Sequence, residues 1–246
     1  MQKVNQQTQQ PTRPWPTVEQ ALTRRQVSCY VLDLNELQSH INIDNARELL
    51  AGRIMDKYLD RAERVRPLRG KLSAIGVGLL LSGILGIRRQ KQLEIGEHGK
   101  PEPASGAYHM SISDAGMRSV VAVAPVTFGV DVEVEPQKMD RMEIRTLQRV
   151  GCKIPQEMVD HPEQMSANEF CRRWTKVEAV LKAEGSGFTA DPRDHQDWFD
   201  KWPCVWADLP EHVVCAATRD QLPLELIPVD AGELLARVYS LDEQSL

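Results

Sequence analysis

Carboxylates occupy every second position in the segment FGVDVEVEP, residues 128–136. After Gly129, valines take one parity and Asp131, Glu133 and Glu135 take the other. Because successive side chains of a β-strand point to opposite faces, the three carboxylates would line one face at intervals of roughly 7 Å. Two interpretations of this face remain open. It is either the solvated side of a half-buried strand, or a site where two carboxylates bind a divalent cation such as Mg²⁺, which takes oxygen ligands.

A second segment of interest is FCRRWTKVEAVLKAEGSGF, residues 170–188. Its apolar residues recur at spacings of three and four, as on the buried face of an amphipathic helix. Glu178 and Lys182 are four residues apart and therefore face the same way. Gly185 and Gly187 are expected to end the helix. Taken alone, this pattern is typical of an ordinary amphipathic helix with a solvated Glu–Lys pair.

The order and spacing of several motifs resemble those of the Sfp-type 4′-phosphopantetheinyl transferase superfamily. GVDVE at 129–133 and WTKVEAVLKAEGSG at 174–187 resemble the family pattern G-[IV]-D-[IV]-E, then W-x-x-K-E-x-x-x-K with a glycine-rich end. Upstream, GKP at 99–101 and SISD at 111–114 match two further motifs of these enzymes. The resemblance covers roughly residues 27–220.

This resemblance implies an activity and roles for particular residues. Enzymes of this kind move the phosphopantetheine arm of coenzyme A onto a serine of an acyl, peptidyl or aryl carrier protein and release adenosine 3′,5′-bisphosphate. By similarity, Asp131, Glu133 and Glu178 hold Mg²⁺, and Glu178 is also the general base for the serine. Lys182 binds phosphate oxygens, and Ser113 contacts the nucleotide phosphate. Whether the carrier serves fatty-acid, polyketide or nonribosomal peptide synthesis stays open.

Coenzyme A also carries a 3′-phosphate, so its pocket needs further cations. Lys100 of the GKP motif is one candidate. The basic run DRAERVRPLRGK, residues 60–71, supplies others, which are Arg61, Arg64, Arg66 and Arg69. A solvated helix face is an equally good interpretation for any single arginine of this run.

Two positions depart from the family pattern. Val177 stands where the family has a lysine, and Lys176 lies one residue earlier. A shift of one residue on a helix rotates a side chain by about 100°, so Lys176 need not reach the site. Asp114 follows Ser113, where the family has a histidine. These departures favour, as the alternative function, a weakened paralogue that binds carrier protein or coenzyme A without efficient turnover.

A metal-dependent phosphohydrolase built on the same acids is a second alternative. It would need the additional His or Asp cluster of a two-metal site, and the sequence shows no such cluster near these motifs.

The order of predicted helices and strands indicates an α+β protein with two similar halves related by a pseudo-twofold axis. Each half would contain an antiparallel sheet and a long packed helix, since the order of strand, long helix and antiparallel strands occurs twice along the chain. We expect halves at 26–125 and 126–246, behind a disordered leader at 1–25 that is rich in Gln, Pro and Thr.

Local patterns predict the elements of the first half. A strand is expected at 27–37, a helix over 42–60 and an apolar helix over 71–86 that ends at glycine. Two strands, at 108–113 and 118–125, are expected to form a hairpin.

Composition restricts the class of protein. The chain has 246 residues and a net charge of −5, which argues against a general nucleic-acid binder. Its longest apolar stretch, 72–87, is interrupted by serines and glycines and is expected to be too short to span a membrane. The N-terminus lacks a signal peptide pattern, and the five cysteines include no CxxC pair. We therefore expect a monomeric cytoplasmic protein with reduced thiols.

Overall fold

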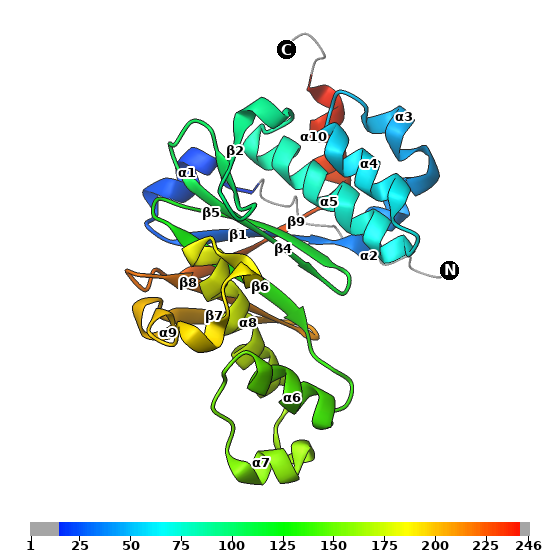
Figure 1. Ribbon diagram of the computed structural model, residues 1–246. Helices are drawn as coiled ribbons and strands as arrows, with labels where there is room; N and C mark the ends of the chain where they lie inside the picture. The colour runs from blue at the N-terminus through cyan, green and yellow to red at the C-terminus, as the bar shows by residue number, and fades with distance from the viewer. Residues whose placement is uncertain (1–14, 242–246) are drawn as a thin grey trace, which may run out of the picture.

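The computed structural model describes residues 15–241, which contain two larger β-sheets and one two-stranded sheet with helices packed around them (Figure 1). The first sheet has the strand order β4-β5-β1-β9, the second has the order β6-β8-β7, and β2 pairs with β3 in a separate hairpin. The strands are β1 (Val27–Asp33), β2 (Leu93–Ile95), β3 (Pro101–Pro103), β4 (His109–Ala115), β5 (Arg118–Ala124), β6 (Phe128–Val134), β7 (Cys204–Leu209), β8 (His212–Thr218) and β9 (Leu224–Val229).

Two helices of 18 residues, α5 and α8, each cover a face of one sheet. The α-helices are α1 (Val18–Thr23), α2 (Leu34–His40), α3 (Ala46–Leu50), α4 (Asp56–Arg64), α5 (Leu68–Leu85), α6 (Arg141–Arg149), α7 (Gln156–Asp160), α8 (Ala167–Glu184), α9 (Trp198–Lys201) and α10 (Ala231–Ser240). Short 3₁₀ segments are η1 (Ile43–Asn45), η2 (Gln90–Gln92), η3 (Pro162–Gln164), η4 (Gly187–Thr189) and η5 (Pro192–Asp194).

Helix α5 forms the centre of the larger core. From Leu72 to Ile84 it is buried on all sides, because it packs between the first sheet and helices α2, α4 and α10. By length and composition it could cross a membrane, contrary to the expectation for 72–87, but 72% of it is buried inside the protein. As expected, it ends at Gly86, which adopts a left-handed conformation with φ of 68°.

The α+β class is confirmed, with mostly antiparallel strand pairs, but the pseudo-twofold repeat is not. One sheet has four strands and the other has three. Strand β9 pairs parallel with β1, and α10 packs on α5, so residues 224–240 join the first sheet rather than the predicted half at 126–246. Within the expected leader, α1 is helical, with Thr17 as its N-cap. Residues 1–14 of that leader lie outside the described residues.

Two predicted elements of the first half are shorter than expected. The first strand ends at Asp33, whose carboxylate accepts a hydrogen bond from Asn35 N at 2.8 Å and thereby caps α2. The helix expected over 42–60 is divided into η1, α3 and α4. The predicted hairpin is present as β4 and β5.

Serine side chains join the two sheets along β4 and β6, which lie side by side (Figure 1). Ser111 Oγ accepts a hydrogen bond from Val130 N at 2.9 Å, and Ser113 Oγ accepts one from Val132 N at 3.4 Å. These hydroxyls satisfy backbone donors of β6 that a neighbouring strand would otherwise satisfy. The junction therefore places the GVDVE strand next to the SISD strand.

Helix α8 approaches β6 most closely at Gly129. A Cβ atom on this residue would lie 2.0 Å from the backbone oxygen of Ala179 and 2.5 Å from the backbone nitrogen of Ala183. Backbone atoms of a helix cannot rotate away from such a contact. The glycine of GVDVE is thus required by the close packing of α8 on the strand.

We expect Gly129→Ala to lower the free energy of unfolding by at least about 1–3 kcal/mol, the usual effect of overpacking a core. Urea unfolding measures the change. Gly96→Ala is the matched control, because its nearest neighbour, the backbone oxygen of Lys100, lies 3.5 Å from the added Cβ, an ordinary contact. Equal stability of the two variants would contradict the proposed reason for the glycine.

Candidate functional site

Three carboxylates from two elements converge between β6 and α8. Asp131 and Glu133 lie two residues apart on β6, and Glu178 lies on the face of α8 that packs against this strand. Each offers one oxygen, and these oxygens all lie within 4.8 Å of one another. Asp131 is only 1% exposed, so at this residue the acidic face of the strand is covered rather than solvated.

Asp131 is the most buried member of this cluster. Its Oδ1 accepts hydrogen bonds from Ser113 Oγ at 2.8 Å and from Lys182 Nζ at 2.7 Å. Its Oδ2 is buried and has no hydrogen-bond partner among the described residues. A buried carboxylate oxygen without a partner is costly. This oxygen therefore fits the position of a cation ligand.

Glu133 is held by an aromatic residue of α8. Trp174 Nε1 donates a hydrogen bond to Glu133 Oε1 at 3.1 Å. The ring of Phe188 stacks on Trp174 with centroids 6.0 Å apart, and Phe188 itself is 55% exposed. The sequence assigned Trp174 only to an apolar helix face. The distance in sequence between Trp174 and the acidic strand did not predict this hydrogen bond.

Burial and mutual repulsion raise the pKa of both glutamates. Burial, then the charge of Asp131, raises the pKa of Glu133 to about 7. The same two causes raise the pKa of Glu178 to about 8, although Lys182, whose Nζ is 3.9 Å from Glu178 Oε2, opposes the shift. Without a further cation the cluster therefore retains protons at neutral pH. A bound divalent cation would favour the charged forms.

In the absence of metal, we expect the free energy of unfolding to fall as the pH rises from about 5 to 8. Both glutamates bind protons more tightly in the folded chain. Both contribute their full stabilisation below the unfolded pKa of 4.5. The contribution of Glu133 is lost as the pH passes about 7, and that of Glu178 is lost as the pH passes about 8. Thermal melting in EDTA across this range measures the slope. Glu133→Gln/Glu178→Gln should flatten it, and an unchanged slope in that variant would contradict the assignment.

Two lysines of the predicted coenzyme A site line one pocket. The pocket has a volume of about 210 Å³ and includes Lys100, Lys182 and Ser111 together with the glycines that follow α8. Lys100 Nζ donates to Phe128 O at 3.1 Å and forms an ion pair with Glu102 at 2.8 Å. Lys182 reaches from this pocket to Asp131. The pocket thus adjoins the carboxylate cluster and has cations for an anionic ligand.

The arginines of the basic run lie farther from this pocket. Arg69 Nη1 donates to Gly116 O at 3.5 Å, in the turn between β4 and β5. A Cβ on Gly116 would lie 3.5 Å from Val134 Cβ, so this turn adjoins the end of β6. Arg61 and Arg64 are exposed at the end of α4, and neither lines the pocket of the two lysines. Arg66 is likewise exposed.

The two departures from the family pattern have structural explanations. Val177 is buried in an apolar cluster with Val150 and Leu181, so a lysine at this position would not lie beside Glu178 on the carboxylate face. Because adjacent residues of a strand face opposite ways, Asp114 points away from the face that carries Ser113.

Glu135, the third carboxylate of the alternating segment, is half-buried. Its Oε1 accepts a hydrogen bond from Asn168 Nδ2 at 2.8 Å. It therefore has a structural partner on α8, outside the carboxylate cluster.

No protein-family model matches this chain, and it has no significant match among curated proteins.

Proposed function

We propose that the protein transfers the 4′-phosphopantetheine arm of coenzyme A to a serine of an acyl, peptidyl or aryl carrier protein. The main support is the convergence of two motifs that lie far apart in the sequence. Asp131 and Glu133 of GVDVE meet Glu178 of the α8 motif within 4.8 Å. The pocket that adjoins them contains Lys100 and Lys182.

The carboxylate cluster is suited to Mg²⁺, a hard cation that prefers oxygen ligands. Asp131, Glu133 and Glu178 would hold it, and the partnerless Oδ2 of Asp131 supports this assignment. When bound, Mg²⁺ would neutralise charge on the oxygens of the pyrophosphate.

The remaining chemistry is assigned to side chains of this chain. Lys182 and Lys100 would bind phosphate oxygens in their shared pocket. Glu178 would accept the proton of the carrier serine while the serine oxygen forms a bond to the β-phosphorus. The bond from that phosphorus to the bridging oxygen breaks, and adenosine 3′,5′-bisphosphate leaves with the bonding electrons. Positioning and charge neutralisation supply most of the catalysis in phosphoryl transfer.

The alternative, a weakened paralogue, receives less support from the site than from the sequence. Val177, which stands where the family has a lysine, lies on a face of α8 that does not meet the carboxylate cluster. The retained Asp131, Glu133, Glu178 and Lys182 are the groups that the proposed reaction uses.

The direct test combines the protein with coenzyme A, Mg²⁺ and an apo carrier protein from each of the three classes. Mass spectrometry should detect the phosphopantetheine group on the carrier serine in at least one class, together with free adenosine 3′,5′-bisphosphate. Binding of coenzyme A without any modified carrier would favour the weakened paralogue. Hydrolysis of coenzyme A alone would favour the phosphohydrolase.

A further inference from the structure

A second cavity, of about 360 Å³, lies on another side of α8. Its walls are α8, the loop at 150–153 and the segment at 196–200, which overlaps α9. Val177 lines it, and because this residue immediately precedes Glu178, their side chains diverge by about 100° around the helix. The volume is in the range of sites for small molecules.

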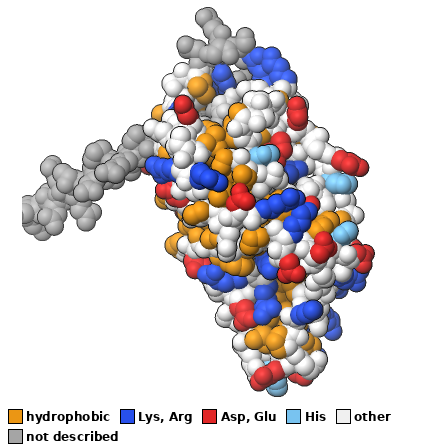
Figure 2. All heavy atoms as spheres, turned by 90° about the vertical axis from the view of Figure 1, so that its left-hand side faces the viewer, with side chains coloured by type: hydrophobic (Ala, Val, Ile, Leu, Met, Phe, Trp, Pro, Cys, Tyr) orange, Lys and Arg blue, Asp and Glu red, His pale blue; other side chains and the backbone are white. Residues whose placement is uncertain are grey.

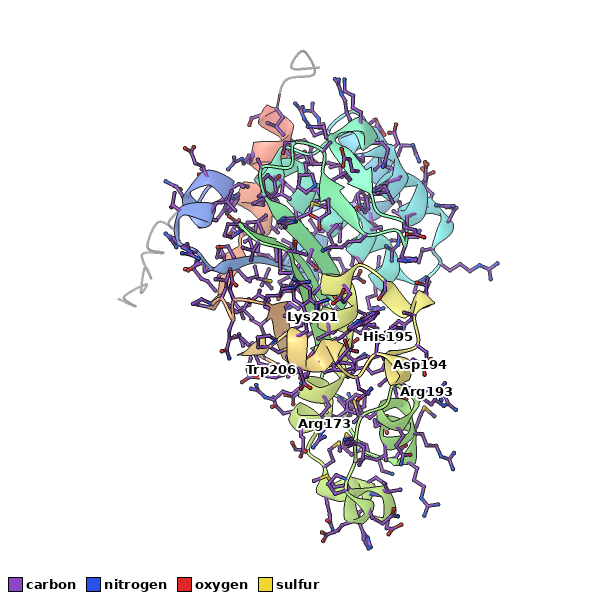
Figure 3. The ribbon with its side chains drawn as sticks, turned by 60° about the vertical axis from the view of Figure 1, so that its left-hand side comes forward. Arg173, Arg193, Asp194, His195, Lys201 and Trp206 are labelled. Carbon is purple, nitrogen blue, oxygen red and sulfur yellow. The ribbon has the colours of Figure 1, made fainter. Side chains whose placement is uncertain are left out.

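The walls of this cavity contact one another directly. Gly151 has a φ of 81°, and a Cβ there would lie only 2.7 Å from Gln196 Nε2 and 3.2 Å from Arg193 Cγ. Arg173 Nη1, on α8, donates to Lys153 O at 3.3 Å. Arg173 and Arg193 are labelled in Figure 3, where they come from α8 and from the segment before α9. The loop is thus in contact with both other walls.

The cavity is positively charged. Within residues 15–241, its lining includes Lys153, Arg173 and Lys176 but only one carboxylate, that of Asp200. Arg173 is neutralised by Glu169, at 2.7 Å. Among the described residues, neither lysine forms an ion pair. The whole chain carries a net charge of −5, and the face in Figure 2 has both signs interspersed, so this local excess of cations would attract an anion.

Apart from Gln196, the rest of the lining is apolar. Val150 and Val177 are buried, and Phe199 lies beside them in the same cluster. Lys176 Nζ is 5.8 Å from the centroid of the Phe199 ring, so the cation borders the apolar surface. A ligand that fits both parts would have an anionic group joined to a compact apolar body.

We propose that this cavity binds a small organic anion, with its carboxylate or phosphate group between Lys153 and Lys176 and its apolar body against Val177 and Phe199. Val177, the one position of α8 that departs from the transferase pattern, lines this cavity together with the preceding residue, Lys176. The proposal does not depend on the proposed transfer reaction, because the site is separate from the carboxylate cluster.

Isothermal titration of the metal-free, full-length protein with phenyl phosphate and with benzoate tests the proposal and distinguishes the two anionic groups. Benzyl alcohol has the apolar body without charge, and inorganic phosphate has the charge without the body. Lys153→Gln/Lys176→Gln removes the cations of this cavity. Lys57→Gln/Lys91→Gln is the matched control, since these lysines lie in the first half of the chain and outside the cavity. Lys182→Gln tests binding at the other anion pocket.

At least one of the two organic anions should bind with saturation. The affinity should fall at least about tenfold in Lys153→Gln/Lys176→Gln, the scale expected for losing hydrogen bonds to a charged group. It should change little in the control pair and in Lys182→Gln. Benzyl alcohol and inorganic phosphate should each bind at least about tenfold more weakly. Absence of saturable binding, or a loss confined to Lys182→Gln, would overturn the proposal and leave the transferase proposal unaffected.

Discussion

Asp131→Asn is expected to reduce phosphopantetheine transfer by about 10³-fold or more while leaving the fold intact. Metal ions contribute several kcal/mol to catalysis of this kind, and each 1.36 kcal/mol is a factor of ten in rate. The substitution keeps the size of the side chain but removes its charge. It also leaves Lys182 without its closest carboxylate, which lies 2.7 Å away in the native protein.

Two measurements check this expectation. Transfer is followed over a Mg²⁺ titration, and melting temperatures are measured with and without Mg²⁺. Wild-type protein should melt at a higher temperature with Mg²⁺, and Asp131→Asn should lose most of that increase. Glu135→Gln is the control, because Glu135 directly follows β6 but accepts a hydrogen bond from Asn168, outside the cluster. Strong residual transfer by Asp131→Asn at saturating Mg²⁺ would refute the role of Asp131.

The site elements were predictable because their signals are local. Alternation along 128–136 predicted a strand, and the spacing of apolar residues over 170–188 predicted a helix that Gly185 ends. The structure has both elements within a few residues of those bounds. Local periodicity also places Glu178 and Lys182 on one face of α8. Only the family resemblance suggested that this face would meet Asp131.

Contacts between distant segments had no such local signal. Ser111 and Ser113 bond the backbone of β6, and Trp174 bonds Glu133 across 41 positions of sequence. Strand β9 was missed because it is a short edge strand that contains Pro228, and proline weakens a strand pattern. The pseudo-twofold is not confirmed, and the local patterns gave no sign that β9 pairs with β1 or that α10 packs on α5.

Glu178→Gln should separate a role in proton transfer from a role as a metal ligand. The variant keeps the size and one acceptor oxygen but cannot take the serine proton. If Glu178 acts mainly as the general base, kcat should fall by about 10²–10⁴ with little change in coenzyme A affinity. If it acts mainly as a ligand, Mg²⁺ and coenzyme A should bind more weakly together, and excess Mg²⁺ should restore part of the rate. Glu169→Gln, on the same helix and outside the cluster, is the control.

The pH profile provides an independent test of the same residue. A general base is active when deprotonated, so the wild-type rate should rise with pH through the apparent pKa of Glu178. That value should lie below the metal-free pKa of about 8, because a bound cation favours the carboxylate. Glu178→Gln should lose this rise. A variant with near-native kcat, native metal affinity and an unchanged pH profile would exclude both roles, and the proposed transfer reaction would then lack its base.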